Sequence, residues 1–290
     1  MTDETVTTPH DEHLDNPVGR LWRLLENMWS INAETQIGRA WSSYLNLPID
    51  EPARFLPAWA RLVELPDEAH AAIEAAAFPA RKTATYLASV DRSRGVFVHA
   101  ANAATPVSSA LPSYSASDLT VLELCSGELI DLGLYVSPSL DALKNLRNAA
   151  QNLLEEVTRS GASSEFIVFL VEMMRRVIDE IDSYAAGGWE PIAAEWERLH
   201  GRARMTHDLK DQLERAPGVA KNFLIVVVAI SQLLTGSLDA AQHDLNSADT
   251  FVKDVTTLVE AIPDATKVIL PPEETSPGPT SDPSGKGDSK

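Results

Sequence analysis

The chain has 290 residues, and its 44% hydrophobic content is enough to fill the core of one large domain or of two modest ones. Its 42 acidic and 24 basic residues give a formal net charge of −18, which disfavours binding to nucleic acids because their phosphate backbone is also negative. Cys125 is the only cysteine, so an intrachain disulfide and a cysteine-based zinc site are excluded.

Residues 1–15 carry several acidic side chains and no apolar run. We therefore expect a disordered, solvated tail. A signal peptide needs a basic start followed by an apolar segment, and its absence here favours a cytoplasmic location. The first helix is predicted to begin after Asn16, a good N-cap residue, with Pro17 in its first position.

Helical spacing of apolar residues continues beyond this helix, first over residues 37–47. The next helix starts near Asp50 and is expected to end at Pro66. Asp67 then opens an alanine-rich helix that runs through Ala77. The helix after Asp50 is predicted to have one apolar face, formed by Phe55, Leu56, Trp59, Leu62 and Val63.

The least regular part of the chain lies between residues 80 and 118. Residues 86–90 can be helical, whereas 95–98 form too short an apolar segment to establish a sheet. Residues 103–117 are rich in Ala, Ser, Thr and Pro and predict a loop. We therefore expect an N-terminal helical region over 16–118, with an irregular segment near 103–117.

A second helical region is expected over residues 119–268. Its strongest helix is predicted to start at Ser139 or Asp141 and to continue to about residue 159. Either Ser163 or Ser164 is expected to cap the helix that follows. These caps precede long stretches with apolar residues three or four positions apart, which is typical of bundled helices.

The end of the chain is predicted to change character. Pro191 begins another helix, and a final amphipathic helix is expected near residues 245–262. Residues 269–290 are rich in Pro, Ser and Gly, which predicts a second disordered tail. The fold class that follows is all-α: a multi-helix bundle with disordered N- and C-terminal tails.

Two parts of the chain resemble proteins of a known kind. In residues 143–202 the similarity consists of Leu154-Glu155-Glu156-Val157, a Ser160-Gly161 break, Phe166 with Phe169-Leu170, Ile181-Asp182-Ser183-Tyr184, Gly188 and Ile192. Residues 40–65 are similar to the early helices of the same proteins. Together these segments resemble uncharacterised helical bacterial proteins of mobile-element and phage-defence neighbourhoods. The resemblance implies a link to antiviral defence, but no activity and no functional residue.

Asp67, Glu68, Ala69 and His70 spell the DEAH box, which in helicases holds Mg²⁺ beside a phosphate-binding loop. That loop requires Gly-x-x-x-x-Gly-Lys-Ser/Thr, which this sequence lacks. We therefore interpret the box structurally, as acidic residues at the start of a helix, where the helix dipole favours negative charge.

Glu197 and His200 form a Glu-x-x-His pair that could share a metal on one helix face. A di-iron bundle needs a second such pair and two more glutamates, and the sequence contains no second pair. The His-Glu-x-x-His zinc signature and the Gly-x-Ser-x-Gly serine elbow are also absent. We therefore predict no metal, no cofactor and no catalytic residue.

Cysteine and tryptophan allow a structural and a functional interpretation. Cys125 lies on an apolar face, so a buried, inert thiol is expected rather than a nucleophile.

Four of the six tryptophans fall in the first 60 residues: Trp22, Trp29, Trp41 and Trp59. They could form a pocket or an interface. Their helical spacing, shared by Trp189 and Trp196, favours packing in a core.

Residues 222–238 contain no charged side chain. A helix that is apolar on all sides is either buried in a core or inserted into a membrane. This segment of about 17 residues falls between a core helix and the ~20 residues of a membrane span. Polar residues such as Asn222 and Gln232 favour the core, whereas basic residues before the segment suit a membrane helix with a cytoplasmic N-terminal side.

These features predict a non-enzymatic, cytoplasmic protein that acts through contacts with another protein or with itself. The alternative is a membrane-associated effector, active in phage defence, whose segment 222–238 inserts into a bilayer. An enzyme of an unfamiliar type is the third interpretation, because many active sites leave no local motif.

Overall fold

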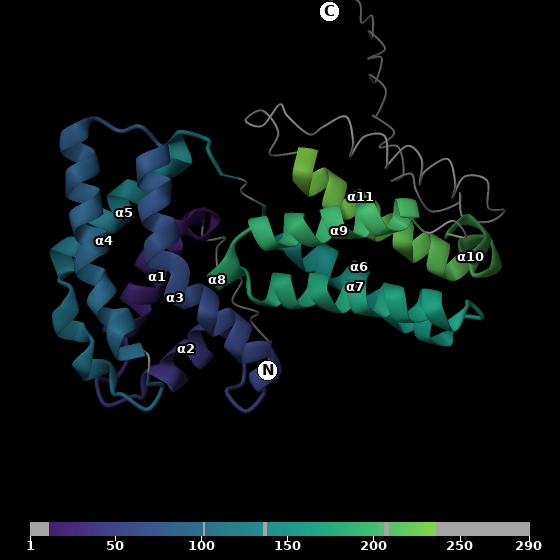
Figure 1. Cartoon of the computed structure of the whole chain (residues 1–290), viewed down its shortest axis with the longest axis horizontal. Helices are drawn as coiled ribbons and strands as arrows, with labels where there is room; N and C mark the ends of the chain where they lie inside the picture. Colours follow the sequence, from purple (N-terminus) through teal and green to yellow (C-terminus); the bar gives the residue numbers. More distant parts are fainter. Residues whose placement is uncertain (1–11, 101, 136–137, 206–208, 236–290) are drawn as a thin grey trace, which may run out of the picture.

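The computed structural model describes residues 12–100, 102–135, 138–205 and 209–235 (Figure 1). Every regular element within these ranges is a helix, and a single isolated β-bridge joins Gln36 to Pro106. The predicted all-α multi-helix bundle is therefore confirmed. The segments 1–11 and 269–290 of the predicted tails, and the helix predicted near 245–262, lie outside the described residues.

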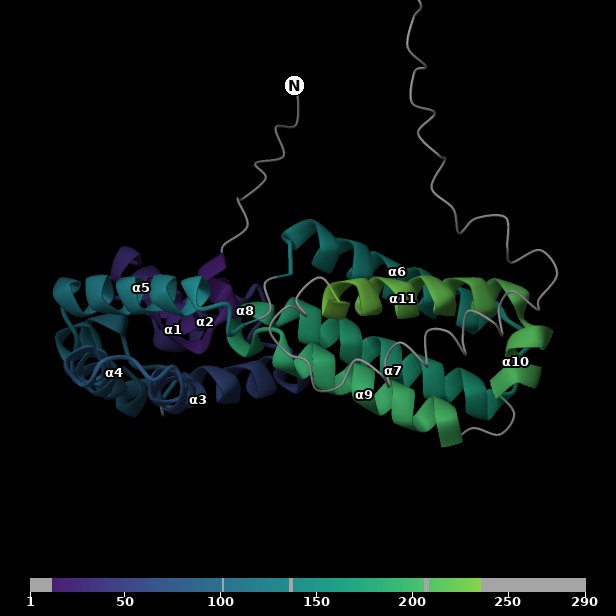
Figure 2. The same ribbon diagram turned by 90° about the horizontal axis from the view of Figure 1, so that it is seen from above.

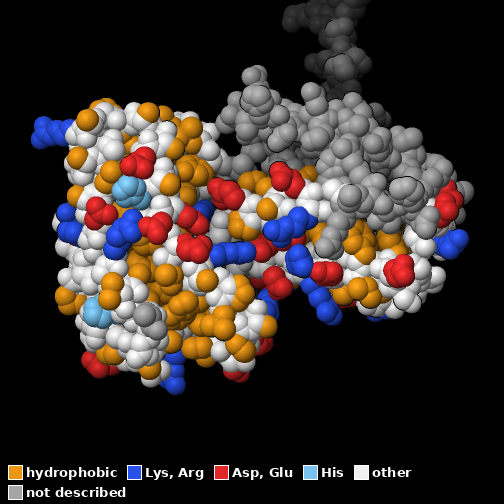
Figure 3. All heavy atoms as spheres, viewed as in Figure 1, with side chains coloured by type: hydrophobic (Ala, Val, Ile, Leu, Met, Phe, Trp, Pro, Cys, Tyr) orange, Lys and Arg blue, Asp and Glu red, His pale blue; other side chains and the backbone are white. Residues whose placement is uncertain are grey.

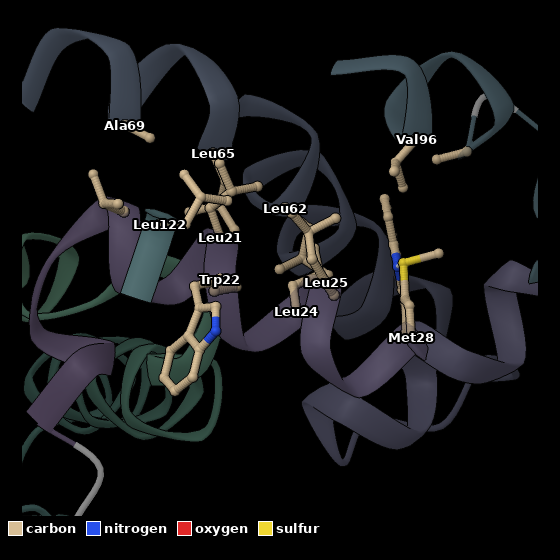
Figure 4. Packing of buried hydrophobic residues seen from close by; sticks show 14 of the residues in the cluster. Leu21, Trp22, Leu24, Leu25, Met28, Leu62, Leu65, Ala69, Val96 and Leu122 are labelled. Atoms are coloured by element: carbon tan, nitrogen blue, oxygen red, sulfur yellow. The ribbon is translucent and has the colours of Figure 1, made fainter. Parts of the chain in front are cut away.

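The first half of the chain forms one group of helices around α1. In chain order this group comprises η1 (Glu12–Asp15), α1 (Pro17–Ser30), α2 (Ile37–Leu45), α3 (Pro52–Ala75), α4 (Ala80–Ala100), η2 (Val107–Ser109), η3 (Leu111–Ser113) and α5 (Ala116–Asp131). Helix α1 packs against α3 and α5, and Leu21, Leu24 and Leu25 are fully buried between them (Figure 4). As predicted, Asn16 caps α1, its side chain accepting a 2.9 Å hydrogen bond from the backbone N–H of Gly19.

The N-terminal tail was expected to extend to residue 15, but Glu12–Asp15 form the 3-10 helix η1. Asp15 is buried, and His13 lies 2.8 Å from the hydroxyl of Ser126 on α5. The local sequence gives no sign of this contact because the partner is 113 residues away. The expected solvated tail is therefore wrong for these four residues.

Helix α3 corrects a second expectation, since it continues through Pro57 and Pro66 to Ala75. A proline inside a helix removes one backbone hydrogen bond and costs about 3 kcal/mol when nothing compensates. Here Pro66 is buried, and Leu65 before it and Ala69 after it are fully buried in the same core. Tertiary packing therefore keeps continuous a helix that local rules predict to end.

Residues 95–98 belong to helix α4, which agrees with the expectation that they form no sheet. The irregular segment predicted over 103–117 is confirmed up to residue 115, where the short 3-10 turns η2 and η3 are the only regular elements. Helix α5 begins at Ala116 and so includes the last two residues of the predicted loop. Ser115 caps it, and Asp118 completes a capping box by accepting a 2.9 Å hydrogen bond from the N–H of Ser115.

The second half of the chain forms a separate group of helices. It comprises α6 (Leu140–Arg159), α7 (Ser164–Asp182), α8 (Tyr184–Gly187), α9 (Glu190–Met205), α10 (Leu209–Arg215) and α11 (Pro217–Thr235). Ser139, rather than Asp141, caps α6, and Ser163, rather than Ser164, caps α7. Helix α6 packs against α7 and α11, and α9 packs against α7 (Figure 2).

The apolar segment predicted over 222–238 forms most of α11, and residues 236–238 lie outside the described part of the chain. Phe223, Val226, Val227 and Ile230 are fully buried in the second core, whereas Ile225 is exposed. Among the described helices, none combines the length and the hydropathy that a membrane crossing requires.

The two groups have separate hydrophobic cores, and the division between them differs from the expected boundary at residue 118. Leu122, Cys125 and Leu129 of α5 are buried in the first core with α1 and α4. The second core begins with Leu143 of α6. The N-terminal group therefore extends through Asp131, because α5 supplies a wall of the first core.

Candidate functional site

The DEAH sequence lies in the middle of α3, not at the start of a helix as expected, and its side chains separate. Glu68 accepts a 3.2 Å hydrogen bond from Nη2 of Arg20, and Asp67 pairs with Arg94 at 2.6 Å. His70 lies 3.5 Å from Glu74, one turn further along α3. The three polar residues thus take part in three different contacts within the protein. This agrees with the interpretation that the DEAH sequence has a structural role.

The other predicted sites are also dispersed. Glu197 is exposed on α9, and the side chain of His200 lies outside the described part of the structure. No group of three metal-ligating side chains occurs among the residues that are described. Cys125 is buried as predicted, and burial, together with the nearby charge of Glu128, raises the pKa of its thiol to about 12. At neutral pH this thiol stays protonated and a poor nucleophile.

The tryptophans divide into packed and accessible ones. Trp22, Trp41, Trp189 and Trp196 are buried in the two cores, as their spacing predicted. Trp29 is exposed, and Trp59 is partly buried against the first core.

A charged cluster around the buried Arg20 lies where α1, α3 and α8 meet. The side chain of Arg20 is only 2% exposed, and its guanidinium donates to Glu68 and to the carbonyl of Leu14. Nearby, the Tyr184 hydroxyl donates a 2.5 Å hydrogen bond to the carboxylate of Asp15. Burial raises the pKa of the Glu68 carboxyl, and the charge of Arg20 offsets part of this effect. Each described side chain of this cluster is held by another, which indicates a structural junction.

A second set of charges joins α3 to the end of α7. Arg61 makes a two-pronged ion pair with Glu180, one prong measuring 2.7 Å, and also donates to the hydroxyl of Ser183. Arg54 contacts Asp179 at 3.3 Å and Asp182 at 2.9 Å. These pairs link the two groups of helices across the boundary between their cores.

Local sequence patterns do not predict this junction, although the sequence contains one signal for it. Asp179, Glu180 and Asp182 all lie in the last turn of α7, which contains no basic residue. Carboxylates are unfavourable at a helix C-terminus because of the helix dipole, so three of them there indicate cationic partners elsewhere in the fold.

Arg147 of α6 also pairs with Asp182, at 2.7 Å, beside an open groove of about 410 Å³ between α6 and α7. Arg54, Arg147 and Arg175 line this groove together with Asp179, Asp182 and Glu155. The positive and negative charges balance, and Arg54 and Arg147 already bind carboxylates of the chain. The groove is therefore poorly suited to holding an anionic ligand.

An accessible apolar surface lies on the outer side of α3. The side chains of Leu56, Trp59, Ala60 and Val63 follow the helical spacing i, i+3, i+4 and i+7, and are here called the α3 stripe. Leu56 is 59% exposed and Val63 is 40% exposed. The predicted single apolar face is thus split, because Phe55 and Leu62 point into the core instead.

Trp59 fixes this stripe to the body of the protein. Its ring centroid lies 4.5 Å from that of the fully buried Trp41 and 5.3 Å from that of Phe55. The ring of Phe97 on α4 also packs near Trp41, with the two ring centroids 5.8 Å apart. Hydrophobic side chains gather over this part of α3 and α4 in the space-filling view (Figure 3). The stripe is therefore a rigid apolar surface with a tryptophan in it.

Comparison with protein-family models, with curated proteins and with solved structures gives no match for this chain. The similarity to proteins of phage-defence neighbourhoods stays a prediction.

Proposed function

We propose that the protein acts without catalysis, by binding another protein through the α3 stripe. The main support for this proposal is that Leu56 and Val63, on either side of Ala60, are exposed beside the ring of Trp59, which packs against the core. Contiguous exposed apolar side chains mark interaction surfaces more often than single ones do. Tryptophan in a well-packed setting is also enriched among the residues that dominate binding energy.

The charged residues support the same proposal. The buried or half-buried groups of the junction, such as Arg20, Arg61 and Glu180, are engaged with one another. The buried thiol of Cys125 has its pKa raised by desolvation, which removes nucleophilic reactivity at neutral pH. The α3 stripe, by contrast, has exposed atoms that no described part of the chain covers.

A photo-crosslinking amino acid placed at residue 56 or 63 tests this proposal in intact cells. We expect a crosslinked protein from these two positions and none from residue 168. Val168 is the control because it lies on α7, outside the stripe, and is an apolar residue at least as exposed as Leu56 and Val63. The captured protein, once purified, should bind the wild-type chain and bind the double variant Leu56→Gln/Val63→Gln at least about tenfold more weakly. Equal crosslinking from all three positions would refute the proposed surface.

The membrane-acting alternative would require α11 to leave its position against α6. The buried faces of Phe223, Val227 and Ile230 support its place in the second core instead.

A further inference from the structure

We infer that the α3 stripe binds a basic amphipathic helix of the partner protein. This inference rests on the proposed function and adds the partner's chemistry. The stripe extends along two turns of one helix, with the small Ala60 between the larger side chains of Leu56 and Val63. A small residue between two large ones leaves a depression that accepts an apolar side chain from a second helix packed alongside.

The charges around the stripe favour a basic partner. Glu64 follows Val63 directly and is exposed, and Asp67 and Asp91 lie further along α3 and on α4 with 74% and 60% of their side chains exposed. Arg94 pairs with both aspartates, at 2.6 Å and 3.2 Å, so one cation is shared by two carboxylates and the exposed Glu64 adds a third negative charge. The rim of the stripe is therefore negative on balance.

The two arginines of α3 do not alter this balance. Arg54 and Arg61 are turned toward α7, where they pair with Asp179, Asp182 and Glu180. Basic side chains on a docked helix would meet the acidic rim while its apolar side chains cover the stripe.

The same charges argue against a second copy of this chain as the occupant. Each copy carries a formal net charge of −18 and the same acidic rim, so two copies repel each other as their stripes approach. A partner helix rich in Lys or Arg is attracted instead, and the attraction weakens as salt screens it.

Two designed helical peptides of about 18 residues, with the same leucine face but either Lys or Glu at the polar positions, test the inference. Fluorescence anisotropy of labelled peptide with the full chain gives the affinity. We expect the Lys peptide to bind about tenfold or more tightly than the Glu peptide at low salt, with the difference shrinking as salt rises.

Neutral variants separate a defined site from general attraction between opposite charges. Leu56→Gln/Val63→Gln keeps the charge and should weaken binding of the Lys peptide at least about tenfold. The control Val168→Gln, on α7, should bind as the wild type does. Glu64→Gln should weaken the Lys peptide a few-fold and leave the Glu peptide unchanged or slightly tighter. Circular dichroism verifies that every variant remains folded.

Three results would overturn the inference. One is Lys-peptide binding that is insensitive to Leu56→Gln/Val63→Gln, and another is a Glu peptide that binds as tightly as the Lys peptide. The third is a wild-type chain that sediments as a dimer while the double variant sediments as a monomer. If the crosslinking experiment still identifies a partner that depends on the stripe, the proposed function stands. Only the inference that the partner binds through a basic helix is then wrong.

Discussion

At the scale of single residues, Gly188 meets two requirements at once. Its backbone has φ of 66° and ψ of −151°, a conformation open almost exclusively to glycine. A Cβ at this position would also lie 2.0 Å from Nη1 of the buried Arg20. Any side chain here would therefore strain the backbone and displace a guanidinium that the surrounding helices enclose.

Gly188→Ala is expected to lower the free energy of unfolding by at least about 2 kcal/mol, because the backbone strain alone costs 1–3 kcal/mol. Thermal or denaturant unfolding followed by circular dichroism measures this loss. Gly127→Ala in α5 is the matched control, since a Cβ there meets nothing within 4 Å. The control should be neutral or stabilising by up to about 1 kcal/mol. Equal stability of both variants would contradict this account of Gly188.

At the scale of elements, the capping box at the start of α5 carries a pH dependence. Burial opposes ionisation of Asp118, but hydrogen bonds from Arg92 and Ser115 outweigh burial and lower the pKa of its carboxyl. A carboxyl whose pKa is lower in the folded chain stabilises the fold above its unfolded pKa. This stabilisation is lost as the pH falls through the lowered folded pKa.

We expect Asp118→Asn to lower the free energy of unfolding at neutral pH by about 1–3 kcal/mol, because it weakens charge-assisted hydrogen bonds. The difference from the wild type should shrink as the pH falls below the usual carboxyl range. Urea unfolding at several pH values measures it. Asp131→Asn, at the exposed end of the same helix, serves as the control. A difference that stays constant with pH would refute the linkage to Asp118.

Helix α11 offers a direct comparison between its two sides. Val227 is fully buried, whereas Ile225, two residues earlier, is 42% exposed. Val227→Asp should destabilise the fold by several kcal/mol because it buries a carboxylate without a partner, and the protein should unfold or precipitate. Ile225→Asp should cost far less, since its carboxylate can reach water. Similar soluble yields and melting temperatures for the two variants would disprove the packed position of α11.

At the scale of the whole molecule, ion pairs link the two groups of helices. The side chains of Arg61 and Glu180 are 27% and 15% exposed, so water screens their pair only partly. Arg54 of α3 and Arg147 of α6 both form ion pairs with Asp182 of α7, which adds a contact among these three helices. This polar junction lies between two apolar cores, and it can therefore be weakened without opening either core.

A double-mutant cycle of Arg61→Ala and Glu180→Ala measures the strength of this link. We expect a coupling free energy of about 1.5–3 kcal/mol, typical of charged hydrogen bonds that are partly desolvated. Arg176→Ala and Glu172→Ala provide the matched cycle, since this pair lies four residues apart on α7 with both side chains 43% exposed. That exposed pair should couple by about 0.3–0.5 kcal/mol. Equal couplings would show that the junction contributes no more than a surface pair.

The sequence by itself determined that the chain is helical and where several of its helices begin, although it indicated only residues 86–90 of α4. Asn16, Ser139 and Ser163 were identifiable because an N-cap acts on backbone groups two or three residues away. The burial of Cys125 also followed from a local apolar pattern, whereas the burial of Phe223, Val227 and Ile230 was one of two alternatives that the apolar segment left open. The structural interpretation of the DEAH sequence required only the absence of a phosphate-binding loop.

Only the tertiary structure decided where the helices meet and which apolar side chains remain outside. Pro66 stays within α3 because the first core packs around it, and α5 joins that core across the expected boundary. Arg61 and Glu180 are 119 residues apart, and no local spacing relates them. Leu56 and Leu62 appeared equivalent in one apolar face, yet one is exposed and the other buried. Periodicity specifies the faces of a helix, but the neighbouring helices determine which of those faces they cover.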